Sequence, residues 1–165
     1  WVYERHQGDA TETDRGPARA IDSLFVTGDT IINGNSYAVI HKATDGALTP
    51  LVRYWRDSAN YIVTSTHQIL FSSTVFDQVI YTQADENLHI EYSVGSGLVP
   101  VSVPAGNFDC YLVKGISTSL GNLPVIPEWK YPREYWAADV GRVKWYEYYV
   151  IAPFGYRYEL MHFHV

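Results

Sequence analysis

Short segments in which apolar and polar residues alternate follow one another along most of the chain. The clearest covers residues 88–94, where Leu88, Ile90, Tyr92 and Val94 alternate with polar residues. Because successive side chains of a strand point to opposite faces, this pattern predicts a half-buried antiparallel strand. No segment of about ten residues or more combines a 3.6-residue apolar period with capping residues, so we expect no long helix.

Turn residues separate these segments at short intervals. Asn33-Gly34 and Asp45-Gly46 are typical of two-residue hairpin loops, in which both positions take positive φ. We also expect a turn at Gly28-Asp29 and a strand break at Gly95–Gly97, because glycine interrupts strands. About ten strands with a spacing of about 8–12 residues predict an all-β domain, either a sandwich or a barrel that is open or closed.

The chain divides into a short N-terminal part and one large domain. Its 165 residues are close to the usual size of one domain, which can bury a core without disulfides. Residues 1–20 are expected to form a short strand over 1–6, followed by a mobile polar arm that carries two glycines and a proline. Residues 21–165 are expected to form a single antiparallel β domain.

Composition and charge argue against several partners. A formal net charge of −6, without any run of basic residues, argues against nucleic acid and against an anionic membrane surface. No apolar stretch approaches the roughly 20 residues of a transmembrane helix. The chain begins at Trp1 rather than Met, so we expect that a targeting segment has been removed. Such a segment would place the domain outside the cytoplasm, and it is a candidate for a membrane anchor.

Two motifs in the second half of the chain resemble known proteins. Residues 103–111 fit the pattern V-P-A-G-x-F-x-x-Y, and residues 135–144 fit Y-x-A-x-x-V-G-x-V-K. In this order they resemble uncharacterised lipoproteins of the bacterial envelope, which are similar in turn to the lipoprotein-carrier (LolA/LolB-like) fold. Residues 29–37 and the strand over 51–58 also resemble secreted proteins of the Bacteroidetes.

The resemblance implies a fold and a location. The lipoprotein-carrier fold is a single strongly curved antiparallel sheet around an apolar concavity, which implies an open barrel or half-barrel of about ten strands, with a β-sandwich as the alternative. It also implies a periplasmic, outer-membrane-anchored or secreted protein. It implies little about function, and this chain lacks an evident helical plug for the concavity. Turn chemistry explains the same motifs, since Pro104 ends a strand and Gly106 and Gly141 permit turns.

Residues that often bind metals or act as nucleophiles are isolated in this sequence. His162 and His164 share one face of a predicted strand, but the sequence supplies no further ligands at a typical zinc spacing. Cys110 follows Asp109, whose charge would raise the pKa of the thiol. We therefore expect no metal site and a buried, unreactive cysteine.

No motif for hydrolysis or cofactor binding is present. The chain has no Gly-x-Ser-x-Gly motif, no glycine-rich phosphate loop and no dinucleotide fingerprint. Glu91 could pair with Glu147 or Glu159, but nothing in the sequence places two carboxylates the roughly 5–10 Å apart that glycoside hydrolysis needs. We expect a protein that is not an enzyme and has no catalytic residue and no cofactor, with a polysaccharide hydrolase as the weaker alternative.

Aromatic residues are the remaining distinctive feature. The chain has 14 Tyr, 6 Phe and 5 Trp, and adjacent ring pairs place rings on both faces of predicted strands. A sheet with rings on both faces has a second apolar surface, which is a lined concavity, a partner interface or a stacking platform for sugars. Half-exposed tyrosines whose hydroxyls reach water are the simpler explanation of the same pattern.

We expect the domain to bind an apolar or amphiphilic, lipid-like ligand in its concavity. The residues expected to bind it are Tyr54, Trp55, Tyr92, Trp136 and Trp145. Burial of an acyl chain would gain about 0.8 kcal/mol for each methylene group, so even a shallow groove would hold one. The alternative is a structural or interaction module of the cell envelope, whose exposed rings bind a protein or a glycan.

Overall fold

The computed structural model describes residues 1–8, 16–120, 124–149 and 154–164. Twelve strands lie within these ranges: β1 (Val2–Gly8), β2 (Ala18–Ile32), β3 (Asn35–Thr44), β4 (Ala47–Ser58), β5 (Tyr61–Thr64), β6 (Ile69–Ser72), β7 (Val79–Ala84), β8 (Leu88–Val103), β9 (Gly106–Ser119), β10 (Arg133–Ala137), β11 (Gly141–Tyr148) and β12 (Gly155–His162). One 3-10 turn, η1, spans Glu128–Lys130. None of the described residues belongs to a helix long and apolar enough to cross a membrane.

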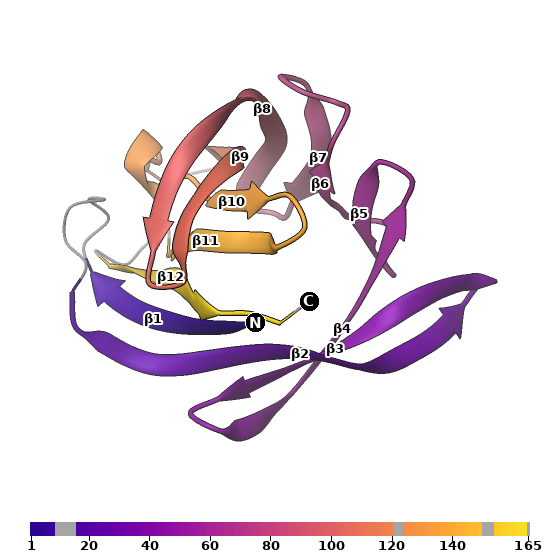
Figure 1. Ribbon diagram of the computed structural model, residues 1–165. Helices are drawn as coiled ribbons and strands as arrows, with labels where there is room; N and C mark the ends of the chain where they lie inside the picture. Colours follow the sequence, from indigo (N-terminus) through magenta and orange to yellow (C-terminus); the bar gives the residue numbers. More distant parts are fainter. Residues whose placement is uncertain (9–15, 121–123, 150–153, 165) are drawn as a thin grey trace.

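The twelve strands form one antiparallel sheet. Their order is β6-β5-β4-β3-β2-β1-β12-β11-β10-β9-β8-β7, so the first and last strands of the chain pair with each other. The sheet curls until its edge strands, β6 and β7, come together, which gives a nearly closed barrel (Figure 1). The prediction of a single curved antiparallel sheet is confirmed. The sandwich alternative is wrong, and the sheet has twelve strands, which is more than the expected number.

The tight turns predicted from Asn-Gly and Asp-Gly are present. Asn33 and Gly34 have φ angles of 50° and 79°, and Asp45 and Gly46 have φ angles of 48° and 81°. Positive φ at both positions matches the right-handed twist of the flanking strands. These turns fix the β2–β3 and β3–β4 hairpins and therefore determine which residues of β4 face the barrel interior.

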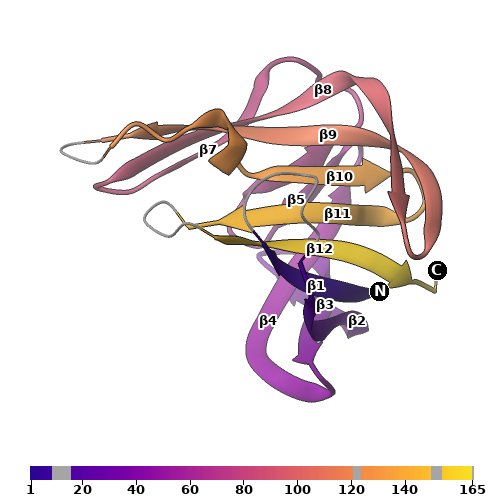
Figure 2. The same cartoon turned by 90° about the vertical axis from the view of Figure 1, so that its left-hand side faces the viewer.

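Two glycine segments that were expected to end strands form bulges instead. β2 continues through Gly28, and β8 continues through Gly95–Gly97, each with a shift of register. A bulge bends a strand without ending it, because the ladder resumes after the extra residues. The bend in β8 folds the end of the β8–β9 hairpin toward β12 (Figure 2), where the amide of Ala105 donates to the carbonyl oxygen of Leu160 at 2.9 Å.

The N-terminal strand lies in the middle of the sheet order. β1 pairs with β12 on one side and with β2 on the other. It continues to Gly8, beyond the predicted end at residue 6, and β2 already begins at Ala18. Both ends of the predicted polar arm therefore belong to strands, and its middle, residues 9–15, lies outside the described residues.

The core consists largely of aromatic rings. The ring of Trp145 stacks on Tyr158, with centroids 4.1 Å apart and planes 4° from parallel, and Tyr3 meets Trp145 edge-on at 4.7 Å. All three are at most 5% exposed. A second cluster contains the buried ring of Trp136. Burial of a side chain of this kind contributes about 3 kcal/mol, so packing is a large part of what holds these indoles in place.

Candidate functional site

One face of β10 and β11 carries alternating charged and aromatic residues. Glu134 and Trp136 lie two residues apart on β10, and Trp145 and Glu147 lie two residues apart on β11. Residues at this spacing share one face of a strand. In the sheet register Trp145 pairs with Glu134 on one side and with Tyr158 of β12 on the other. These side chains therefore form a continuous polar and aromatic surface.

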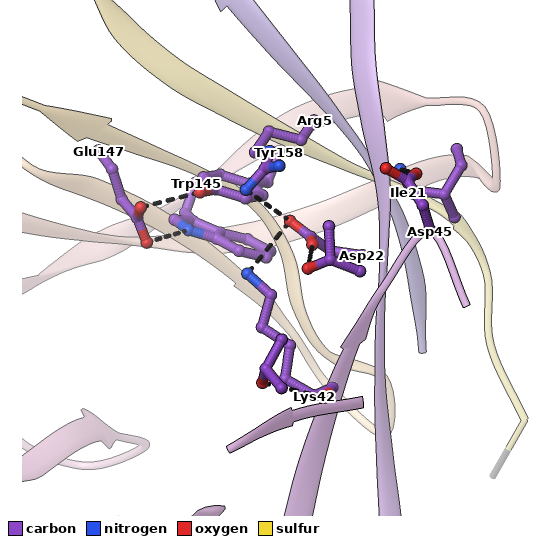
Figure 3. A network of polar contacts seen from close by, with 10 residues as sticks. Arg5, Ile21, Asp22, Lys42, Asp45, Trp145, Glu147 and Tyr158 are labelled. Atoms are coloured by element: carbon purple, nitrogen blue, oxygen red, sulfur yellow. Dashed lines mark hydrogen bonds and ion pairs between the residues drawn. The ribbon is translucent and has the colours of Figure 1, made fainter. Parts of the chain in front are cut away.

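Glu147 accepts hydrogen bonds from two rings of this surface (Figure 3). Nε1 of Trp145 donates to Oε1 at 3.1 Å, and the hydroxyl of Tyr158 donates to Oε2 at 2.9 Å. Burial, followed by the negative charge of Glu147, raises the pKa of Tyr158 far above that of a free tyrosine. Tyr158 therefore remains protonated, and its hydroxyl remains a donor, at physiological pH.

The carboxylate of Glu134 also accepts two hydrogen bonds. Nε1 of Trp136 donates to its Oε2 at 3.0 Å, and Nη1 of Arg142 donates to its Oε1 at 3.1 Å. The guanidinium carbon of Arg142 also lies 4.0 Å from the ring centroid of Trp145, which is a cation–π contact. Each carboxylate oxygen of Glu134 and Glu147 therefore already has one donor.

A second ionic cluster surrounds Asp22 (Figure 3). Asp22 is 1% exposed, and its Oδ2 lies 3.2 Å from Nζ of Lys42 and 3.6 Å from Nη1 of Arg5. The hydroxyl of Thr44 donates to its Oδ1 at 2.6 Å. A buried carboxylate needs such partners, because desolvation of an unpaired charge costs several kcal/mol. The cluster joins β1, β2 and β3, and its role is structural.

A cavity of about 500 Å³ lies beside the surface of β10 and β11. We call it the polar cavity, and it is lined by Val52, Arg53, Tyr54, Trp55, Thr64, Ser65, Thr66, Gln68, Leu70, Gln83, Glu134, Arg142 and Glu147. β4 and β10 are far apart in the strand order, so a cavity lined by both lies inside the barrel. A smaller cavity of about 260 Å³ adjoins it, since Gln83, Glu134 and Glu147 line both.

A third cavity, of about 430 Å³, has a mostly apolar lining. We call it the apolar cavity, and its lining includes Trp1, Ile62, Phe71, Tyr111, Trp136 and Val140. The ring of Trp136 stacks on Phe71 at 5.5 Å, and its centroid lies 6.5 Å from that of Trp55. Trp55 lines the polar cavity and Trp136 lines the apolar cavity, so this pair of indoles lies between the two cavities, which share no lining residue.

All five residues predicted to bind a ligand border these cavities. Tyr54 and Trp55 line the polar cavity, and Trp136 lines the apolar cavity. Tyr92 and Trp145 line the smaller cavity beside the polar one. The structure thus brings together rings from β4, β8, β10 and β11. Trp136 and Trp145 are only 4% and 5% exposed, so a small part of each ring reaches the cavities.

Sequence reasoning missed most of the charged residues of the polar cavity. Arg53, Glu134 and Arg142 line it together with Glu147. One signal was available, because Glu-x-Trp at 134–136 and Trp-x-Glu at 145–147 place a carboxylate and an indole on the same face of each strand. Nothing in the local sequence singles out Arg53.

The carboxylate pairs considered in the sequence, Glu91 with Glu147 or Glu159, do not share any of the three cavities. Glu91 is exposed, and the buried Glu159 forms ion pairs with Lys144 and Arg157. Glu147 instead shares two cavities with Glu134. Because all four oxygens of these two carboxylates already accept hydrogen bonds, they fix the surrounding rings and Arg142 in place.

Cys110 and the C-terminal histidines do not line the three cavities. Cys110 is fully buried, as predicted, and burial followed by the charge of Asp109 raises the pKa of its thiol to about 11. His162 and His164 are exposed. No group of three potential metal ligands occurs within the part of the chain that the structure describes.

Comparisons with known proteins support the fold. No family model matches the chain, and no curated protein matches it. A solved structure that does match is that of a predicted exported protein of Bacteroides fragilis NCTC 9343 with a YmcC-like fold. The match has a TM-score of 0.60 and 14% sequence identity, and it covers 97% of this chain and 93% of that chain. At this identity the chain is similar to that protein in fold over nearly its whole length, and the match carries no information on function.

Proposed function

We propose that this domain binds a small amphiphilic ligand inside its barrel, outside the cytoplasm and without catalysis. The observation that carries the proposal is an apolar cavity and a polar cavity on either side of the Trp55–Trp136 pair. A ligand with an apolar part and a polar part would reach across this pair and place one part in each cavity. Their volumes, about 430 and about 500 Å³, lie within the range of small-molecule sites.

The apolar cavity supplies the larger share of the expected affinity. A chain of eight buried methylenes would gain about 6 kcal/mol before the entropic cost of association is subtracted. The packed rings of Phe71 and Trp136 form a preformed wall for such a chain. Preformed walls favour binding because little side-chain entropy is lost when the ligand enters.

The hydrogen bonds of the two cavity carboxylates favour binding over catalysis. Glu134 and Glu147 share a cavity, but each of their oxygens already accepts a hydrogen bond from an indole, a tyrosine or an arginine. A general acid or base must exchange a proton with the substrate. Carboxylates engaged in this way suit a structural role better.

The extracytoplasmic location is supported by the similar fold of a predicted exported protein. The motifs over residues 103–111 and 135–144, which resemble envelope lipoproteins, point in the same direction. We extend the proposal to a periplasmic, outer-membrane-anchored or secreted domain.

The test is saturable binding of a neutral fluorescent probe, N-phenyl-1-naphthylamine, and its displacement by dodecyl maltoside. Ile62→Trp should fill the apolar cavity and weaken binding at least tenfold, because Ile62 lines it. Ile31→Trp is the matched control, since Ile31 is 69% exposed, and it should bind like the wild type. Absence of saturable binding to the wild type, or equal binding by Ile62→Trp, would contradict the proposal.

A second candidate function is an interaction module of the cell envelope. The observation that favours it is a set of exposed apolar residues on β2 and β4, namely Phe25, Val26, Ile31, Leu48 and Leu51. Exposed apolar residues mark a protein interface where they form one contiguous patch. Sedimentation velocity and a glycan array would test it, and a monomer without glycan binding would contradict it.

A further inference from the structure

The polar cavity contains a cation whose hydrogen-bonding capacity is unused. Arg53 lies on β4, lines the cavity and is partly buried. Its side chain makes neither a hydrogen bond nor an ion pair with any residue that the structure describes. An arginine side chain carries five N–H donors in a planar fork. The N–H donors of Arg53 are therefore available to a ligand in the cavity.

A second guanidinium lines the same cavity. The side chain of Arg142 is 10% exposed, and its Nη1 donates to Glu134, while its Nε and Nη2 have no hydrogen-bond partner. Burial lowers the pKa of Arg53, and the positive charge of Arg142 lowers it further, against the opposite effects of Glu134 and Glu147. Two guanidinium groups in one desolvated cavity are stabilised by an additional negative charge.

The two carboxylates of the cavity are already engaged. Nε1 of Trp136 and Nη1 of Arg142 donate to Glu134, and Trp145 and Tyr158 donate to Glu147. Each of the four carboxylate oxygens therefore has one donor, whereas the side chain of Arg53 has no acceptor. Among the charged groups of the polar cavity the unused capacity is on the guanidinium groups, so a complementary ligand brings acceptors and negative charge.

We infer that Arg53 binds an anionic group of the ligand, a carboxylate or a phosphate, in the polar cavity, with Arg142 beside it. The inference deepens the proposed function and rests on it: the apolar part of the ligand lies in the apolar cavity beyond the Trp55–Trp136 pair. The planar fork of an arginine matches two oxygens of a carboxylate or a phosphate at once. Lysine keeps the charge at this position but cannot form that paired contact.

The experiment compares ligands that share a twelve-carbon chain and differ in head group. Dodecanoate, dodecyl phosphate, dodecyltrimethylammonium and dodecyl maltoside would each displace N-phenyl-1-naphthylamine from the wild type, Arg53→Gln, Arg53→Lys and Arg19→Gln. Arg19 is exposed on β2 and serves as the matched control. For the wild type we expect at least tenfold tighter binding of one or both anions than of the maltoside, and the weakest binding of the ammonium.

Arg53→Gln should remove the preference for anions and leave the affinity for dodecyl maltoside within twofold of the wild type. Arg53→Lys should keep part of the preference, and Arg19→Gln should keep all of it. Tighter binding of dodecyl phosphate than of dodecanoate would indicate a ligand with a phosphate group, and the reverse order would indicate a ligand with a carboxylate group. Binding of inorganic phosphate alone, lost in Arg53→Gln, would support the anion site and weaken the proposed contribution of the apolar cavity.

Failure of the inference is distinguishable from failure of the proposed function. Equal binding of all four head groups, or an anion preference that survives in Arg53→Gln, would overturn the role of Arg53 while the proposed function stands. Absence of binding by every amphiphile and by the probe would contradict the proposed function itself. Thermal unfolding of each variant without ligand shows whether it is folded, and Arg53→Gln should unfold at or above the temperature of the wild type.

Discussion

The two walls of the polar cavity differ in how far their polar groups are satisfied. On β10 and β11, Glu134 and Glu147 have a donor on every oxygen, and the indoles that donate to them are packed in the core. On β4, the side chain of Arg53 makes no hydrogen bond or ion pair with the described residues. The carboxylates of one wall are therefore fixed in place, whereas Arg53 on the other wall, with Nε and Nη2 of Arg142 facing it from β11, retains donors for a ligand. A site of this kind combines a fixed geometry with an open contact.

We call the wall formed by β10 and β11 the packed wall and the wall formed by β4 the open wall. The largest effect on stability is expected from a substitution in the packed wall. Trp145→Ala removes a 5%-exposed indole that stacks on Tyr158 and holds Glu147, and it should destabilise the domain by about 3–5 kcal/mol. Trp129→Ala, at a residue that is 42% exposed, should cost less than about 1 kcal/mol. Urea unfolding measures both values. Equal costs for the two variants would show that the packed wall is not the stable part of the molecule.

A smaller loss of stability is expected when Glu147, the hydrogen-bond acceptor of this wall, is replaced. Glu147→Ala leaves Nε1 of Trp145 and the hydroxyl of Tyr158 without their acceptor and should cost about 1–2 kcal/mol. Glu147→Gln should recover part of the loss, because its amide oxygen still accepts one of the two bonds. Glu91→Ala, at an exposed site, should change the free energy of unfolding by less than about 0.5 kcal/mol.

Alkaline pH should weaken the packed wall. Burial raises the pKa of Tyr92 to about 12 and that of Tyr158 further. The folded state therefore holds these protons more tightly than the unfolded state, so stability is full below about pH 10, the ordinary tyrosine pKa, and declines as the pH rises above it. Each such group contributes a slope of at most about 1.4 kcal/mol per pH unit. Tyr158→Phe should flatten the decline, whereas Tyr149→Phe, at an exposed residue, should not.

The smallest effect on stability is expected from a substitution in the open wall, and it should raise stability or leave it unchanged. Arg53→Gln removes a partly buried charge whose side chain makes no hydrogen bond or ion pair with the described residues, so the free protein should be unchanged or more stable by up to about 1 kcal/mol. Urea unfolding without ligand measures the change. A loss of more than about 1 kcal/mol would mean that Arg53 has a structural partner and that the two walls do not differ as described.

Local sequence patterns predict the strands well and the curvature of the sheet poorly. The alternation over residues 88–94 lies in β8, and Asn33-Gly34 forms the β2–β3 turn. Gly28 and Gly95–Gly97 carry the same glycine signal, yet they form bulges inside strands. Glycine permits both a turn and a bulge, and the choice depends on pairing with neighbouring strands, which the local sequence does not contain.

Some residues of the candidate site could likewise be predicted from the local sequence, and others could not. The rings were found because adjacent aromatic residues must point to opposite faces of a strand, as at Tyr54-Trp55. Arg53 was missed because arginines mostly face solvent, and only the closing of the sheet turns β4 toward β10 and β11. Glu134 was within reach of the sequence through the Glu-x-Trp spacing, which places it on the same face as Trp136.

The most direct test of the account measures two quantities on one preparation of Arg53→Gln: its dissociation constant for dodecanoate or dodecyl phosphate and its free energy of unfolding without ligand. The account predicts that binding of the preferred anion weakens at least tenfold while stability stays equal or rises. An affinity like that of the wild type combined with reduced stability would contradict it, because Arg53 would then support the fold and not the ligand.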